Sequence, residues 1–279
     1  MMRKYIYSIF FVASIFAGCS SAKELTVLHT NDTHSQILPF SKNLADTMIA
    51  DRGGFIRRIN MLKQERAADP ELLLFDSGDF SQGSTYYSMY KGDVETGLMN
   101  MMHYDAGTIG NHEFDFGLDN MARLFKKLNF PIVCSNYDFT GTSLEGVVKP
   151  YTILHRKGLK IGVFALCTKM DGLVDKKNYL TVKFLDPVTV GNKMASFLRN
   201  EEKCDLVICL SHLGWDIPGF SDEEMIAESK NIDLVLGGHS HSNMVDLTLV
   251  KDADGKKVAV DQNGKSGVYI GKLKLEFKK

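Results

Sequence analysis

This sequence of 279 residues has no long apolar run in its body, no strong excess of one charge and no cysteine pair with C-x-x-C spacing. The lack of a C-x-x-C spacing makes metal binding by thiolates the weakest interpretation of its cysteines. A formal net charge of -1 does not favour a nucleic-acid polymer as partner. Internal repeats, low-complexity tracts and linkers are missing, which favours a single domain. A content of 44% hydrophobic and 24% charged residues excludes disorder.

The N-terminus has the pattern of a cleavable export signal. Arg3 and Lys4 precede an apolar run from Tyr5 to Phe16, and small residues then lead into Cys19. The run is shorter than the roughly 20 apolar residues that a membrane-spanning helix needs. We therefore predict a signal peptide over residues 1–18, a short tether over 19–24 and a folded domain over 25–279.

The small residues before Cys19 resemble the lipobox of bacterial lipoproteins. The resemblance implies that Cys19 is acylated, becomes the first residue of the mature protein and anchors it to a membrane. An exported lipoprotein, periplasmic or anchored in the outer membrane, is thus expected. Plain secretion with cleavage near Ala22 is the alternative. Loss of Arg3 and Lys4 would make the mature chain two charges more negative than the -1 of the full sequence.

The cysteines of the folded part lie in or beside apolar, strand-like runs. Buried free thiols are common in such positions. An even number of cysteines in an exported protein also permits disulfides. Structural core cysteines are the favoured interpretation for Cys134, Cys167, Cys204 and Cys209.

Short apolar runs alternate with helix-like segments through most of the chain. The expected strands are residues 25–29, 72–76, 106–109, 132–134, 161–166, 206–210 and 234–236. The expected helices are residues 54–66, 93–103, 118–128, 191–200 and 221–229. Strands that are apolar throughout are typical of sheets covered on both faces, and the βαβ order predicts an α/β architecture.

The C-terminal part has a different pattern. Residues 245–250, 257–260 and 268–277 are expected to form antiparallel strands joined by turns. A further tight turn is expected at residues 156–160, between a strand at 151–155 and the one at 161–166. Antiparallel strands should therefore follow the βαβ part of the chain.

Polar side chains follow the predicted strands at five places. One such residue is weak evidence, because an Asp or His near a strand end is more often structural than a ligand. All five clusters, however, follow the carboxyl ends of strands, which is the edge where open α/β sheets bind ligands. We therefore expect one crevice lined by Asp32, His34, Asp79, Asn111, His212, His239 and His241.

This set of side chains favours a divalent metal centre. Carboxylate, amide oxygen and imidazole suit Mn, Fe, Co or Zn, and they disfavour an all-oxygen calcium cage. The candidates are too many for one tetrahedral ion, but they fit two ions that share a carboxylate, about 3.5 to 4 Å apart. Gly78, Gly110, Gly237 and Gly238 would permit the tight turns that the loops need.

The segments around these residues resemble a known family. The set D-x-H, G-D, G-N-H-E, a lone His and G-H-x-H resembles the calcineurin-like metallophosphoesterase superfamily. HTNDTHSQI, DSGDFSQGS and DLVLGGHSH are similar to its 5'-nucleotidase branch, and the resemblance runs from about residue 25 to 243. It implies a four-layer αββα sandwich and two-metal-dependent hydrolysis of nucleotides or related phosphoesters by a metal-activated water.

The resemblance also implies how the ligands divide. It predicts two ligand sets that share Asp79: Asp32, His34 and His241 for one ion, and Asn111, His212 and His239 for the other. His241 stands where some nucleotidases have Gln or Asn, so the identity of the metals stays open among Mn, Zn, Fe and Co.

A catalytic pair is implied beside the metal ligands. By the resemblance, Asn111 and His112 contact the substrate phosphate, and His112 stabilises the transition state or donates a proton to the leaving oxygen. Asp115 would orient and charge that imidazole. The structural alternative is that His112 fills a polar niche while Asp115 caps a helix. The position of His112 beside a predicted ligand favours the catalytic role.

Other conspicuous residues are assigned structural roles. We expect Glu113, His29, His103 and His155 to be structural, and the basic run 57–66 to be the solvated face of a helix. Trp215 can wall the site, although core packing is at least as well supported. Phe80, Tyr86 and Tyr87 are assigned no ligand role.

Substrate choice is less defined than the chemistry. Full-length members of the nucleotidase branch carry a second domain that stacks the nucleobase, and these motifs contain no counterpart of it. One hypothesis is a nucleotide hydrolase completed by a separately encoded nucleotide-recognition domain. A second is a broad phosphomonoesterase or phosphodiesterase acting alone. A third is a non-catalytic metal-binding lipoprotein, which an intact His112 and Asp115 argue against.

Overall fold

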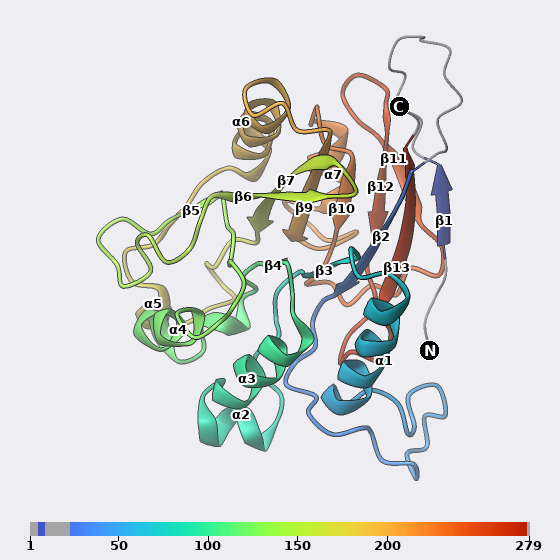
Figure 1. The fold of residues 1–279 in the computed structure, drawn as a ribbon. Helices are drawn as coiled ribbons and strands as arrows, with labels where there is room; N and C mark the ends of the chain where they lie inside the picture. The colour runs from blue at the N-terminus through green and yellow to red at the C-terminus, as the bar shows by residue number, and fades with distance from the viewer. Residues whose placement is uncertain (1–4, 9–22, 278–279) are drawn as a thin grey trace.

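The computed structural model describes residues 5–8 and 23–277. Their strands form two large sheets, with helices on either side (Figure 1). Cys19 and most of the predicted signal peptide lie outside the described residues. Among the helices that the structure describes, none has the length and apolar character needed to cross a membrane.

The first sheet holds the strands that precede three of the predicted ligand loops. β2, β3 and β4 run parallel, whereas β13 is antiparallel to β2 and parallel to β1. In sheet order the strands are β1 (Tyr5–Ser8), β13 (Gly271–Phe277), β2 (Lys23–Thr30), β3 (Leu73–Asp76) and β4 (Ala106–Gly107).

The second sheet has a parallel centre and antiparallel edges. Its order is β11 (Thr248–Lys251), β12 (Lys257–Asp261), β10 (Leu234–Leu236), β9 (Leu206–His212), β7 (Leu159–Cys167) and β6 (Tyr151–Arg156). β6 and β7 form the predicted hairpin. A small separate sheet pairs β5 (Tyr137–Asp138) with β8 (Lys183–Phe184).

Two predictions about strands were wrong. Of the last three strands, β11 and β12 form the predicted antiparallel pair, but β12 also pairs in parallel with β10, and β13 crosses to the other sheet, where Leu273 faces Val27. Residues 132–134 make only isolated bridges, from Ile132 to Gly107 and from Val133 to Lys149. Their neighbour β4 is too short to extend a ladder, so no strand forms there.

Helices cover the outer faces of both sheets, and local signals start several of them. Asp186 accepts a hydrogen bond from the Thr189 amide before α6, and Ser221 and Glu224 form a capping box at α7. The unpredicted α2 is capped by Ser84. The helices are α1 (Phe55–Ala68), α2 (Thr85–Tyr90), α3 (Asp93–Met102), α4 (Gly117–Phe125), α5 (Lys176–Tyr179), α6 (Pro187–Asn200), α7 (Asp222–Ala227) and a 3₁₀ turn at His112–Phe114.

Three apolar layers hold the fold together. Alternate residues of a strand point to opposite faces, so in β3 Leu73 packs between the sheets while Leu74 packs against α1, α3 and α4. The outer face of the second sheet packs against α6 and α7. These contacts give the expected α/β fold with four αββα layers. The free cysteines are buried, as predicted: Cys134, Cys167, Cys204 and Cys209.

Candidate metal centre

The predicted ligands meet at one edge of the sandwich. Asp32 and His34 follow β2, Asp79 follows β3, and His212 ends β9. The remaining loops come after β4 and β10 and carry Asn111, His239 and His241. Segments far apart in the sequence thus converge because the strands before them are neighbours in the two sheets.

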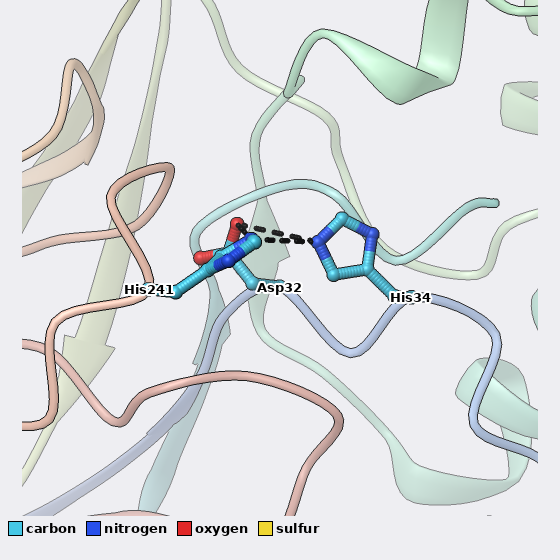
Figure 2. Close-up of side chains that lie close together, drawn as sticks. All are labelled: Asp32, His34 and His241. Carbon is cyan, nitrogen blue, oxygen red and sulfur yellow. Dashed lines mark hydrogen bonds and ion pairs between the residues drawn. The ribbon is translucent and has the colours of Figure 1, made fainter. Parts of the chain in front are cut away.

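One group of donor atoms comprises Asp32, His34 and His241. Figure 2 shows the side chains of Asp32 and His34 directed toward His241, which comes from a different loop. The Nε2 atoms of His34 and His241 are 2.9 Å apart, and His241 Nε2 is 3.5 Å from Asp32 Oδ1. Donor atoms of all three residues lie within 4.8 Å of one another, which is a spacing suited to one ion.

A second group comprises Asp79, His212 and His239, again with donor atoms within 4.8 Å of one another. Asp79 Oδ2 lies 3.3 Å from His212 Nε2 and 4.0 Å from His34 Nε2. The same carboxylate oxygen therefore reaches both groups. This is the geometry that a bridging ligand requires.

Two buried polar atoms in the site fit a cation better than a hydrogen bond. Asn111 Oδ1 and His212 Nε2 have no hydrogen-bond partner among the described residues. His212 Nδ1 donates to the Ser77 carbonyl at 2.7 Å, so in the neutral form of this ring the Nε2 lone pair is directed at the site. Buried polar atoms are almost always satisfied, and lone pairs of this kind match a divalent ion.

The backbone is strained where the ligands are presented. Asp32, His34, Asp79, His239 and His241 all have positive φ, between 41° and 73°. Residues other than glycine adopt this left-handed region only at a cost, and such conformations concentrate at functional sites. The loops therefore turn sharply enough to direct successive side chains inward.

Hydrogen bonds from the surrounding chain orient the two carboxylates. Asn31 Nδ2 donates to Asp32 Oδ2 at 2.7 Å, and the His239 amide donates to the same oxygen at 2.9 Å. The His112 amide donates to Asp79 Oδ1 at 2.9 Å. Asn31 was not singled out from the sequence, although its place directly before Asp32 is a usable signal.

Glu113 has the structural role that we predicted, in a form that sequence alone does not reveal. Its buried carboxylate accepts hydrogen bonds from the amides of Asp79, Ser81 and Gly110, at 2.9, 3.0 and 2.6 Å. It therefore joins the loop after β3 to the loop after β4. Burial, reinforced by the charge of Asp79, raises the pKa of Glu113 to about 7.

Glycine is required where these two loops meet. A Cβ on Gly110 would lie 2.1 Å from Asp79 Oδ1, and one on Gly78 would lie 2.6 Å from the Gly110 nitrogen. Gly78 also has φ of +88°. Only a residue without a side chain allows this close approach.

Replacing Glu113 tests whether it holds the loops together. Glu113→Gln leaves one acceptor oxygen for three amides, so we expect the free energy of unfolding to fall by about 1 to 3 kcal/mol. Urea denaturation followed by circular dichroism measures the change. Glu201→Gln, on the surface at the end of α6, is the matched control. Equal stability of the two variants would contradict this role for Glu113.

Electrostatics keep the carboxylate ionised and two imidazoles neutral. Although burial by itself raises the pKa of Asp79, the imidazoles of His212 and His34 hold it well below its ordinary range. The Asp79 charge in turn raises the pKa of His212 against the effect of burial. Burial and His212 lower the pKa of His239 to about 4, and burial lowers that of His34. Neutral imidazole is the form that binds metals.

His112 and Asp115 form a pair at the rim of the site. Both carboxylate oxygens of Asp115 lie 3.3 Å from His112 Nδ1, and about a third of each side chain is exposed. Burial alone would lower the pKa of His112, but Asp115 and the charge of Asp79 raise it above its ordinary value. The ring lies 5.5 Å from that of His34, which places it beside the predicted metal ligands.

Tyr87 and Trp215 are the aromatic residues considered next to the site. Tyr87, to which we assigned no ligand role, donates from its hydroxyl to the His112 carbonyl at 3.2 Å. Its position in a helix that was not predicted hid this contact. Trp215 packs against the outer core of the second sheet, and its amide donates to Ser240.

Most of the remaining structural assignments agree with the structure, with one exception. His29 is buried and pairs with Asp261 at 3.0 Å, whereas His103 and His155 are exposed. The basic run 57–66 is not wholly solvated, however, because Arg58 is 3% exposed. A helix packed on a sheet buries one stripe of side chains, and Arg58 lies in that stripe together with Phe55, Ile59 and Leu62.

Comparison with known proteins agrees with this geometry. The family model described as calcineurin-like phosphoesterase matches residues 25–243, a range that contains every residue of the candidate site. The chain belongs to the calcineurin-like phosphoesterase family. Such phosphoesterases include the 5'-nucleotidase of Bos taurus, 32% identical over 91% of this chain and 46% of its own length. The human 5'-nucleotidase is 31% identical over 95% of this chain and 49% of its own length.

Solved structures of phosphoesterases share the fold. A 5'-nucleotidase precursor from Thermus thermophilus has a TM-score of 0.79 and 28% identity, covering 90% of this chain and 51% of its own. The NAD nucleotidase of Haemophilus influenzae has a TM-score of 0.81 and 26% identity, and the match covers 92% of this chain and 54% of the nucleotidase chain. The calcineurin-like phosphoesterase YfkN of Bacillus subtilis has a TM-score of 0.72 and 26% identity, and the match covers 93% of this chain and 86% of the solved YfkN chain. The chain spans about half the length of the curated nucleotidases that it matches.

Proposed function

We propose that this phosphoesterase hydrolyses phosphoester bonds of nucleotides or related compounds with two divalent cations. The observation that carries the proposal is the Asp79 carboxylate, which reaches both groups of imidazoles. Asp32, His34 and His241 would hold one ion, and Asn111, His212 and His239 the other, with Asp79 shared. When bound, the cations would lower the pKa of water and offset phosphoryl charge.

The protein's own residues supply the rest of the chemistry. Asn111 and His112, adjacent in the loop after β4, would contact the phosphoryl group of the substrate. Asp115 favours the charged form of His112, and its carboxylate lies within hydrogen-bond distance of His112 Nδ1, which orients the ring. The charged imidazole can then stabilise negative charge in the transition state or give its proton to the leaving oxygen.

A generic substrate tests the proposed reaction. Purified protein without residues 1–18 should hydrolyse an aryl phosphate when manganese is added, and a chelator should abolish the activity because the cations supply the nucleophile and the charge neutralisation. Release of the phenol is followed by absorbance. Absence of turnover with manganese, zinc, iron and cobalt in turn would refute the enzymatic proposal and favour a metal-binding lipoprotein.

The nucleotide part of the proposal rests on the relatives. The two mammalian relatives are named 5'-nucleotidase, and both extend well beyond the matched region. For this chain, base recognition by a separately encoded domain would complete such an activity. AMP, UDP-glucose and 2',3'-cyclic AMP should be compared with and without the product of an adjacent reading frame. Nucleotide hydrolysis by the chain alone would make the partner unnecessary.

A domain acting alone is the second candidate. The solved YfkN chain is covered to 86% by this one, whereas the match covers only 18% of the whole YfkN protein, so a phosphoesterase domain of this size can fold as a separate chain. A broad phosphomonoesterase or phosphodiesterase would then show similar rates for several unrelated leaving groups. A strong preference for one nucleotide in the substrate comparison would argue against it.

We also propose export and lipid anchoring through Cys19, on the support of the N-terminal sequence. Membrane fractions should contain the wild-type protein, and Cys19→Ser should release it because the acylated side chain is lost. Fractionation followed by immunoblotting measures the distribution. Ser20→Ala is the control, and an unchanged distribution of Cys19→Ser would contradict anchoring at this residue.

A further inference from the structure

Arg58 of α1 has a buried charge without a polar partner. The residue is 3% exposed, and none of its Nε, Nη1 and Nη2 atoms makes a hydrogen bond among the described residues. Its guanidinium carbon lies 3.9 Å from the centre of the Phe55 ring. A cation–π contact satisfies no N–H donor, so the buried cation remains costly.

A pocket of about 330 Å³ opens next to this guanidinium. Two more arginines line it, Arg52 and Arg57, together with the apolar side chains of Met61, Val268 and Ile270. Arg57 is paired with Asp51 at 2.8 Å, the acidic member of the lining. The pocket therefore has a cationic end and an apolar wall, and it lies outside the candidate metal centre.

The buried carboxylate of Asp76 makes no hydrogen bond with Arg58. Asp76 is close enough to influence Arg58, but its Oδ2 accepts from the Thr30 hydroxyl at 2.6 Å and its Oδ1 from the Gly78 amide at 3.0 Å. Both oxygens of Asp76 thus have partners in the chain. The N–H donors of Arg58 therefore lack an acceptor among the described residues, and a group that binds in the pocket could supply one.

Gly267 leaves the space that the guanidinium occupies. A Cβ on Gly267 would lie 2.7 Å from the guanidinium carbon, and the residue has φ of +58°. The preceding residue, Ser266, donates its amide to the Asp32 carbonyl at 2.7 Å. The same turn therefore borders the arginine pocket and holds the first metal-ligand loop.

We infer that this pocket binds an oxyanion, a carboxylate or phosphate that carries a short apolar group. The oxyanion would accept hydrogen bonds from Arg58 and Arg52, since the guanidinium fork matches the spacing of carboxylate and phosphate oxygens. The apolar group would pack on Met61, Val268 and Ile270. The site is distinct from the proposed phosphoesterase centre and does not depend on it.

The test uses the metal-loaded protein with hexanoate, inorganic phosphate and hexanol as probes. Hexanoate at ten times its Kd should raise Tm by about 3 °C, because a ligand that binds only the folded state stabilises it. Phosphate reports the oxyanion contribution alone, and hexanol the apolar contribution alone. Arg52→Gln/Arg57→Gln should lose the hexanoate effect, while Lys63→Gln, which removes one positive charge elsewhere on α1, should keep it.

A second background separates this pocket from the metal centre. In His239→Ala the hexanoate effect should persist, because His239 belongs to the metal centre and not to the pocket. Arg58→Met removes the buried cation itself and should also lose the hexanoate effect. If this substitution unfolds the chain, the Arg52→Gln/Arg57→Gln protein, here called the rim variant, decides whether the pocket binds the oxyanion. No stabilisation by hexanoate, equal stabilisation by hexanol, or an unchanged effect in the rim variant would overturn the proposal.

Discussion

Asp79→Ala is expected to reduce aryl phosphate hydrolysis by roughly a thousandfold, because several kcal/mol of transition-state stabilisation depend on the bound cations. Asp79 Oδ2 lies 3.3 Å from His212 Nε2 and 4.0 Å from His34 Nε2, so its removal affects both groups of ligands at once. Loss of any other single ligand leaves one group intact. Asp79→Ala should therefore have the lowest metal content of the single-ligand variants.

Metal content and turnover are measured on the same samples of this variant. Inductively coupled plasma mass spectrometry gives ions per chain, and the aryl phosphate assay gives kcat. Asp171→Asn, whose side chain is exposed and belongs to neither ligand group, is the matched control and should retain both. An Asp79→Ala protein with two ions per chain would remove Asp79 from the bridging position.

The convergence of the ligands was predictable from the sequence because it depends on sheet geometry. Asp32, Asp79 and His212 directly follow or end buried apolar strands, and neighbouring strands bring their ends together. The tight approach of Gly110 to Asp79 was also foreseeable, since glycine clusters accompany sharp turns. These features rest on local patterns that repeat at each strand end.

Features that depend on contacts between distant segments could not be predicted in the same way. β13 leaves its predicted partner and pairs with β2, a choice made by the packing of Leu273 and Leu275 between the sheets. Arg58 looks like its solvated neighbours in sequence, yet it faces the sheet. Glu113 follows His112 directly, and only the fold shows that its carboxylate gathers amides from two loops.

Hydrogen bonds from neighbouring segments support the strained loops that carry the predicted ligands. Five of the predicted ligands have positive φ, a conformation that needs support from elsewhere. The Asp32 loop is held by the Ser266 amide and the Asp32 amide by the Gly78 carbonyl, at 2.7 and 2.9 Å. Glu113 gives the corresponding support to the Asp79 loop. Orientation of the site is therefore built into the backbone before any ion binds.

His112→Ala is expected to lower kcat by about 10²- to 10⁴-fold while both metal ions stay bound. The ring lies beside His34 at 5.5 Å, and Asp115 raises its pKa against the effect of burial, which suits a proton donor or a group that stabilises phosphoryl charge. Its donor atoms also lie within 4.8 Å of those of His34 and Asp79, a geometry that a ligand would share. Metal content therefore distinguishes the two roles.

Asp115→Asn provides the graded comparison for this prediction. The amide keeps the size of the side chain but removes the charge that raises the pKa of His112, so kcat should fall by about 10- to 100-fold with metal content unchanged. An aryl phosphate with a better leaving group needs less help from a proton donor and should recover part of the activity of His112→Ala. Equal losses for good and poor leaving groups would restrict His112 to stabilising phosphoryl charge, and loss of an ion in His112→Ala would make it a ligand.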